Sequence, residues 1–121
     1  MRDEAHHVRS TRASFAFVAS AIALAGALGA CYPPTAAPPG AVSPAGVTWA
    51  AAKWSDANEA KLDGGREIFV ANCNRCHGYP AIMKIGDEKW PDLVKWMGGK
   101  ANLDDAQRQS LLRFILATRH S

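Results

Sequence analysis

The five-residue sequence Cys73-Asn74-Arg75-Cys76-His77 constrains this chain more than any other feature. Two thiols one helical turn apart can add to the two vinyl groups at one edge of a single haem, and Cys-x-x-Cys-His is typical of such attachment. The imidazole of His77 follows directly and can bind the iron, since haem iron accepts a proximal histidine. The motif therefore predicts one covalent haem c, with Cys73 and Cys76 as thioethers and His77 as proximal ligand.

Other interpretations of the motif remain open. A thioredoxin-like redox pair also uses Cys-x-x-Cys, but it expects a preceding strand in a βαβ pattern, whereas a helix-like stretch precedes Cys73 here. A structural zinc site needs four ligands, usually from two separated pairs, and His120 is the only further Cys or His after Cys31. A chance occurrence of the motif is the third alternative.

The first 30 residues have the pattern of a secretory signal peptide. A basic start is followed by an apolar run over 15–28, which is short for a bilayer span of about 20 residues and ends in small residues. The stretch Leu28-Gly29-Ala30-Cys31 resembles the lipobox of bacterial lipoproteins, which implies lipidation of Cys31. Ordinary cleavage near Ala30 and an uncleaved N-terminal anchor are the alternatives. We therefore expect export to the periplasm and anchoring to the inner or outer membrane through Cys31.

Residues 31–54 are predicted to form a tether between that anchor and a domain over 55–121. The stretch up to Thr48 is rich in Pro, Ala and Gly and carries no charge. Its prolines are expected to prevent a helix and favour extended chain: Pro33, Pro34, Pro38, Pro39 and Pro44. Such a tether would hold the domain up to a few tens of ångströms from the membrane, roughly its extended length.

Two longer helices are predicted in the domain. Asp56 and Glu59 have the spacing of a capping box and open a helix whose stripe reads Leu62, Gly65, Phe69 and Cys73. Asp104 and Gln107 have the same spacing before a last helix, whose apolar surface over 111–116 is too wide for one neighbour. That surface should be covered by the first helix and by the haem.

The positions of Gly65 and Phe69, eight and four residues before Cys73, resemble the N-terminal helix of class I cytochromes c. The resemblance covers about 56–118 and is strongest to short bacterial mono-haem domains. It implies an all-α fold in which the N- and C-terminal helices cross beside a covalently bound haem. In that fold the glycine allows the close crossing, and Phe114 is the candidate aromatic at the crossing.

The sixth iron ligand is predicted to be Met97, because a methionine thioether is the usual choice of that family. A helical period over Trp90, Leu93, Val94 and Met97 indicates a short middle helix that carries this axial Met. Pro91 suits its first turn, and Gly98 and Gly99 can end it. Met83 is the alternative ligand, and a site without a sixth protein ligand, with Met97 as ordinary core, is the other.

The second nitrogen of His77 needs a hydrogen-bond partner, and a backbone carbonyl near Pro80 is the candidate. Six residues are candidates for contact with the haem propionates, with a surface or core role as the alternative for each: Arg75, Lys84, Lys89, Lys100, Trp90 and Trp96.

The resemblance implies one-electron transfer between a redox donor and an acceptor at the periplasmic membrane surface. The sequence shows no nucleophile–base constellation, so an enzyme is not expected, and a formal charge of +3 without a basic stripe argues against a nucleic-acid partner. A haem-based ligand-binding or sensing protein with an open or labile sixth site is one alternative. A cytochrome subunit of a larger oxidoreductase is another, so either a monomer or a subunit of a complex is expected.

Overall fold

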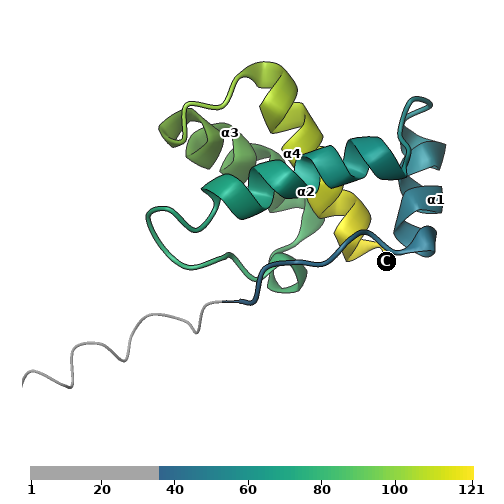
Figure 1. Cartoon of the computed structure of the whole chain (residues 1–121), viewed down its shortest axis with the longest axis horizontal. Helices are drawn as coiled ribbons and strands as arrows, with labels where there is room; N and C mark the ends of the chain where they lie inside the picture. Colours follow the sequence, from purple (N-terminus) through teal and green to yellow (C-terminus); the bar gives the residue numbers. More distant parts are fainter. Residues whose placement is uncertain (1–35) are drawn as a thin grey trace, which may run out of the picture. The chain divides into compact units, whose positions relative to one another are not determined.

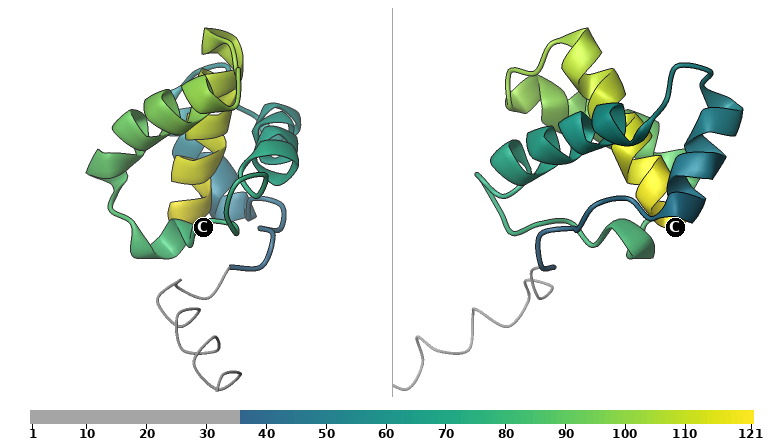
Figure 2. Two further views of the ribbon diagram at one scale, coloured as in Figure 1. Left: turned by 90° about the vertical axis from the view of Figure 1, so that its left-hand side faces the viewer. Right: turned by 45° about the vertical axis from the view of Figure 1, so that its right-hand side comes forward.

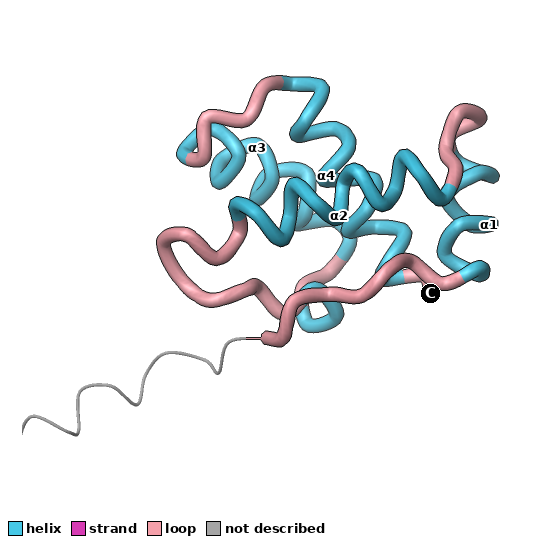
Figure 3. Tube along the Cα trace, viewed as in Figure 1, coloured by secondary structure: helices cyan, strands magenta, loops and turns pink. Residues whose placement is uncertain are grey.

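The computed structural model describes residues 36–121, and this part of the chain is all-helical, as predicted. Four α-helices and two short 3-10 helices follow one another along the chain (Figure 1, Figure 3). They are α1 (Pro44–Lys53), α2 (Glu59–Asn72), η1 (Ile82–Lys84), η2 (Asp87–Lys89), α3 (Trp90–Lys100) and α4 (Asp105–Arg119). The predicted signal peptide, 1–30, and Cys31 lie outside the described residues.

Helices α2 and α4 cross at Gly65, and this contact organises the described fold. A Cβ atom at Gly65 would collide with the backbone carbonyl oxygen of Ser110 and lie 2.7 Å from the Cβ of Phe114. Figure 1 shows α4 passing behind α2 at this point. The close approach predicted for Gly65 is therefore confirmed, and it explains why a residue that is unfavourable in a helix interior stands there.

Aromatic side chains fill the centre of the crossing. Phe69 and Phe114 are fully buried, with ring centroids 5.9 Å apart and planes at 63°, an edge-to-face arrangement. Such pairs contribute about 0.5–1.5 kcal/mol beyond the area they bury. The buried residues of this core come from α2, α3, α4 and the segments between them: Phe69, Ile82, Trp90, Val94, Leu103, Leu111, Phe114 and Ile115.

The start of α2 differs from the prediction. Asn58 caps the helix, its side-chain oxygen accepting a hydrogen bond from the Lys61 N–H at 3.0 Å, so the predicted capping box of Asp56 and Glu59 is wrong. Asp56 instead places its carboxylate between Lys61, at 2.8 Å, and Arg113 of α4, at 3.0 Å. A carboxylate with two cationic partners is not available to cap a helix.

The start of α4 matches the prediction. The Gln107 N–H donates to the Asp104 carboxylate at 2.8 Å, and the Asp104 N–H donates to the Gln107 side-chain oxygen at 3.0 Å. This reciprocal capping box fixes the first turn of the helix.

The end of α3 also differs from the prediction, because the helix continues through Gly98 and Gly99. It ends where Asn102 adopts a left-handed conformation, with φ of 57°. The Asn102 N–H donates to the Gly99 carbonyl at 3.2 Å, and the Leu103 N–H donates to the Gly98 carbonyl at 2.9 Å. These two bonds form a Schellman motif, in which asparagine can replace the usual glycine.

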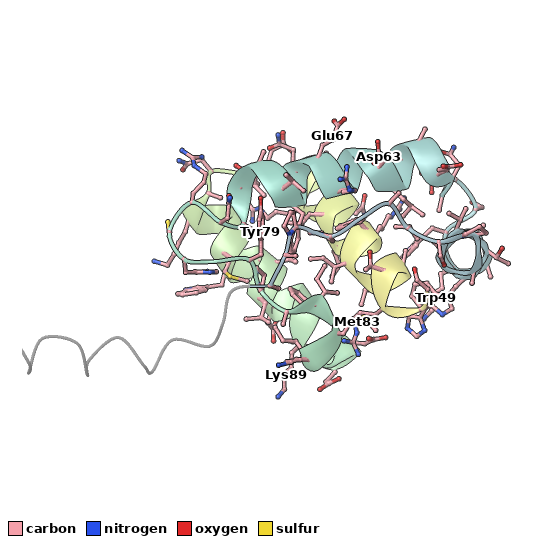
Figure 4. All side chains as sticks on the ribbon, turned by 60° about the horizontal axis from the view of Figure 1, so that its bottom comes forward. Trp49, Asp63, Glu67, Tyr79, Met83 and Lys89 are labelled. Atoms are coloured by element: carbon pink, nitrogen blue, oxygen red, sulfur yellow. The ribbon has the colours of Figure 1, made fainter. Side chains whose placement is uncertain are left out.

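Residues 44–53 form a helix, so the prediction of extended chain through this stretch is wrong. Pro44 lies in the first turn of α1, where its missing N–H is not needed, and Ser43 caps the helix by accepting from the Gly46 N–H at 3.2 Å. Helix α1 packs against the end of α4, where the Trp49 ring stacks on His120 at 4.0 Å between centroids. Figure 4 shows Trp49 beside this end of α4.

The segment before α1 is also attached to the helices. The Ala36 N–H donates to the Tyr79 carbonyl at 3.2 Å, and the Arg66 side chain donates to the Pro39 carbonyl at 2.9 Å. The segment runs beside the 78–82 connection in both Figure 1 and Figure 2. Within residues 36–121, no helix is both long and apolar enough to span a bilayer.

Candidate functional site

A cavity of about 400 Å³ lies between the end of α2, the 73–80 connection, α3 and the 101–103 turn. Its lining includes Cys73, Cys76, His77 and Met97, so four of the predicted site residues meet at one cavity. Met83 lies in η1, outside this lining, with 63% of its surface exposed. The volume is within the range of small-molecule and cofactor sites, roughly 300–1,000 Å³.

The two motif cysteines differ in environment. Cys73 ends α2, its N–H donating to the Phe69 carbonyl at 2.9 Å, and its side chain is partly buried. This burial raises the pKa of the Cys73 thiol to about 11, because the thiolate loses solvation. Cys76 is exposed one turn later. No disulfide joins the two thiols.

The orientation of His77 is fixed through one ring nitrogen. Its Nδ1 lies 2.6 Å from the carbonyl oxygen of Gly78, two residues before Pro80. A neutral imidazole that donates from Nδ1 keeps a lone pair on Nε2, which is the form that binds a metal. His77 is exposed at the cavity, so Nε2 is accessible to an iron.

Trp90 is a candidate donor to a polar group bound in the cavity. The side chain is 1% exposed and lines the cavity, yet its indole Nε1 is buried without a hydrogen-bond partner. A buried donor without a partner costs about 1–3 kcal/mol, so such groups are normally satisfied. A haem has an apolar body and two carboxylates, and one carboxylate oxygen would satisfy this N–H. The donor and the apolar walls therefore fit a haem.

The other propionate candidates divide into two groups. Arg75, Trp96 and Lys100 line the cavity, and the Lys100 Nζ lies 5.0 Å from the centre of the Trp96 ring. Trp96 is 63% exposed, so the cavity has an aromatic and basic rim. Lys84 and Lys89 lie in η1 and η2, away from that lining.

Four residues of the lining were not predicted from the sequence: Asn72, Ala101, Asn102 and Leu103. Leu103 was predictable in principle, because a hydrophobic residue commonly follows the left-handed residue of a Schellman motif and packs back on its helix. The missing step was the identification of Asn102 as the left-handed residue, since two glycines nearby suggested an earlier end.

Among the described residues, no three His, Cys, Asp or Glu side chains group in a way that could hold a metal ion. Comparison of the chain with protein-family models, with curated proteins and with solved structures gave no match.

Proposed function

We propose that this protein is a lipid-anchored mono-haem cytochrome c that transfers single electrons between redox partners at the periplasmic membrane surface. The observation that carries the proposal is the meeting of Cys73, Cys76, His77 and Met97 at one cavity. A thioether pair, a proximal imidazole and a distal sulfur are the complete set of protein groups that such a haem requires.

Each group has a distinct role in the proposed function. Bound haem supplies a reversible one-electron couple. Cys73 and Cys76 would hold the haem covalently, and the contact of the His77 Nδ1 with the Gly78 carbonyl would leave Nε2 to bind its iron. Met97 provides a soft sulfur, which favours ferrous iron and raises the reduction potential. The Trp90 N–H holds a propionate, so that this carboxylate need not be solvated inside the fold.

The crossing of α2 and α4 supports a class I-like cytochrome c fold. Helix α2 leads directly into Cys73, and α4 contributes Leu111 to the cavity while Phe114 packs at the crossing. Helix α3 carries both Met97 and Trp90. In this arrangement, α2 would set the position of the Cys73 thioether and α3 that of the distal ligand.

A pair of methionine variants tests the carrier proposal. Met97→Ala should abolish the weak red-end absorption band of the ferric protein, lower the potential and open the iron to carbon monoxide. Met83→Ala is the matched control, because Met83 is exposed and lies outside the cavity lining, and it should change none of these properties.

Two outcomes would contradict parts of this reasoning. If Met83→Ala abolishes the band and Met97→Ala spares it, the ligand assignment is wrong and the carrier proposal survives. If the wild-type protein is high-spin and binds carbon monoxide quickly, the sensing alternative replaces the carrier. Covalent attachment is tested separately, because acid–acetone extraction of haem from the wild-type protein would refute the thioether assignment.

A further inference from the structure

The described chain begins at a fixed point on the fold. Ala36 donates its N–H to the carbonyl of Tyr79 at 3.2 Å. Tyr79 is itself held to α2, because its hydroxyl donates to the Val70 carbonyl at 2.9 Å and its ring stacks on Phe69 at 5.7 Å. Ala36 is therefore attached to the connection that carries His77, two residues before Tyr79.

The residues that follow Ala36 are attached as well. Arg66 of α2 holds the Pro39 carbonyl, and Val42 packs against both buried clusters of the protein. The chain from Ala36 to α1 thus lies on the surface of the fold. It cannot increase the distance between a membrane anchor and the domain.

The contacts of Ala36 limit the length of chain that can separate the membrane anchor from the domain. This limit rests on the lipidation of Cys31 in the proposed function. Four residues lie between Cys31 and Ala36, which makes five Cα–Cα steps (36 − 31 = 5). At about 3.6 Å per residue this chain spans at most about 18 Å. A tether that ran free to residue 54 (54 − 31 = 23) would span up to about 80 Å. The domain is therefore held near the bilayer by the side on which Ala36 lies.

That side of the protein suits an anionic lipid surface. Met83 is 63% exposed, and Lys84 and Lys89 are exposed beside it on η1 and η2. Two acids lie in the same segment: Glu88 is exposed, whereas Asp87 is paired with Arg119 and His120. Lysine side chains are attracted to the negative potential of anionic headgroups, and a methionine gains free energy by leaving water.

The acidic side chains of α2 stand away from this surface. Figure 4 shows Met83 and Lys89 on the side where the described chain begins, with Asp63 and Glu67 on the far side, along α2. The charge distribution and the anchor thus favour the same orientation.

We propose that the surface formed by Met83, Lys84 and Lys89 rests on the bilayer headgroups. The proximal-ligand connection then lies beside the membrane, so the haem exchanges electrons with a partner bound to the same membrane. The occupant of this surface is a lipid bilayer that contains anionic headgroups.

Spin labels at two positions test this orientation. Met83→Cys and the control Glu67→Cys each add one labelling site to the full lipoprotein, whose own cysteines carry haem and lipid. Each labelled protein is placed in vesicles of phosphatidylcholine, phosphatidylglycerol and a nickel-chelating lipid, with the haem reduced so that it is diamagnetic. We expect nickel to relax the label at position 83 several-fold more than the label at position 67.

A lengthened chain provides the second measurement. A long glycine–serine insertion between residues 35 and 36 leaves the Ala36–Tyr79 bond in place but frees the domain from the bilayer. We expect the difference between the two labels to become much smaller. Equal relaxation of the two labels without the insertion, in protein whose mass shows an acylated Cys31, would overturn the orientation and leave the proposed function standing. An unacylated Cys31 would remove the anchor, and both proposals about the membrane would fail with it.

Discussion

Adjacent glycines in α2 provide an internal control for the helix crossing. Gly64→Ala and Gly65→Ala make the same chemical change at neighbouring positions of one helix. Each should gain about 1 kcal/mol from the higher helix propensity of alanine. The two substitutions differ in what the added Cβ contacts outside the helix. Nothing stands within 4 Å of a Cβ at Gly64, whereas a Cβ at Gly65 meets the Ser110 carbonyl and Phe114.

The cost at Gly65 is expected near the upper end of the range for overpacking, about 1–3 kcal/mol. The obstructing atom is a backbone oxygen, so relief requires α4 to move rather than a side chain to turn. After subtraction of the propensity gain, Gly65→Ala should destabilise the protein by about 2 kcal/mol, while Gly64→Ala stabilises it by up to about 1 kcal/mol.

Thermal unfolding of the two haem-loaded variants, followed by far-ultraviolet circular dichroism, measures these effects. For a domain of this size, 1 kcal/mol shifts the Tm by about 4–8 °C. Gly65→Ala should therefore lower the Tm by about 8–16 °C, and Gly64→Ala should raise it by a few degrees, about half of the first effect at most. If both variants raise the Tm, the close crossing of α2 and α4 is refuted.

Three further measurements test other parts of the fold. Asn102→Ala should lower the free energy of unfolding by about 1 kcal/mol, because alanine is strained at a positive φ, whereas Asn102→Gly should match or exceed wild type in denaturant unfolding. Hydrogen bonds from Arg119 and His120 hold the pKa of Asp87 below its usual range. The Asp87 carboxylate therefore stabilises the folded state fully above its unfolded pKa of about 4, and this stabilisation is lost as the pH falls through the folded-state pKa. Asp87→Asn should thus lower the Tm at neutral pH, and this difference should shrink below about pH 4; a constant difference would contradict the ion pair. Trp90→Phe keeps the apolar wall but removes the Nε1 donor, so it should change the pH dependence of the reduction potential without loss of covalent haem; an unchanged profile would remove the propionate role.

At the starts of α2 and α4, the cap whose interacting residues lie close together in the chain was predicted correctly, and the cap that depends on a distant residue was not. The capping box at Asp104 was correct because its partners lie three residues apart and nothing else binds them. The cap at Asp56 was wrong because Arg113, far along the chain, takes up the carboxylate. Local spacing describes both positions equally well, and a distant charge distinguishes them.

The candidate site shows the same difference between local and distant interactions. The motif at Cys73 and the helical period that ends at Met97 were visible because each is contained in a few turns of chain. Helix α1 was missed because Pro44 was interpreted as a residue that prevents helices, although it occupies the first turn. The helix also depends on its contact with His120, and no local pattern reveals a partner at that distance.

The crossing at Gly65 has a consequence for the order of events in a newly made chain. Gly65 meets residues at least 45 positions later (110 − 65 = 45), in the last helix. A chain that crosses a membrane from its N-terminus presents His77 before α4, which begins 28 residues later (105 − 77 = 28). Until the core has assembled, Cys73 lacks the burial that raises the pKa of its thiol, so the thiol is more reactive while the fold is still open. If the chain is exported and carries haem as proposed, an attachment enzyme would therefore meet Cys73 before α4 has packed on α2.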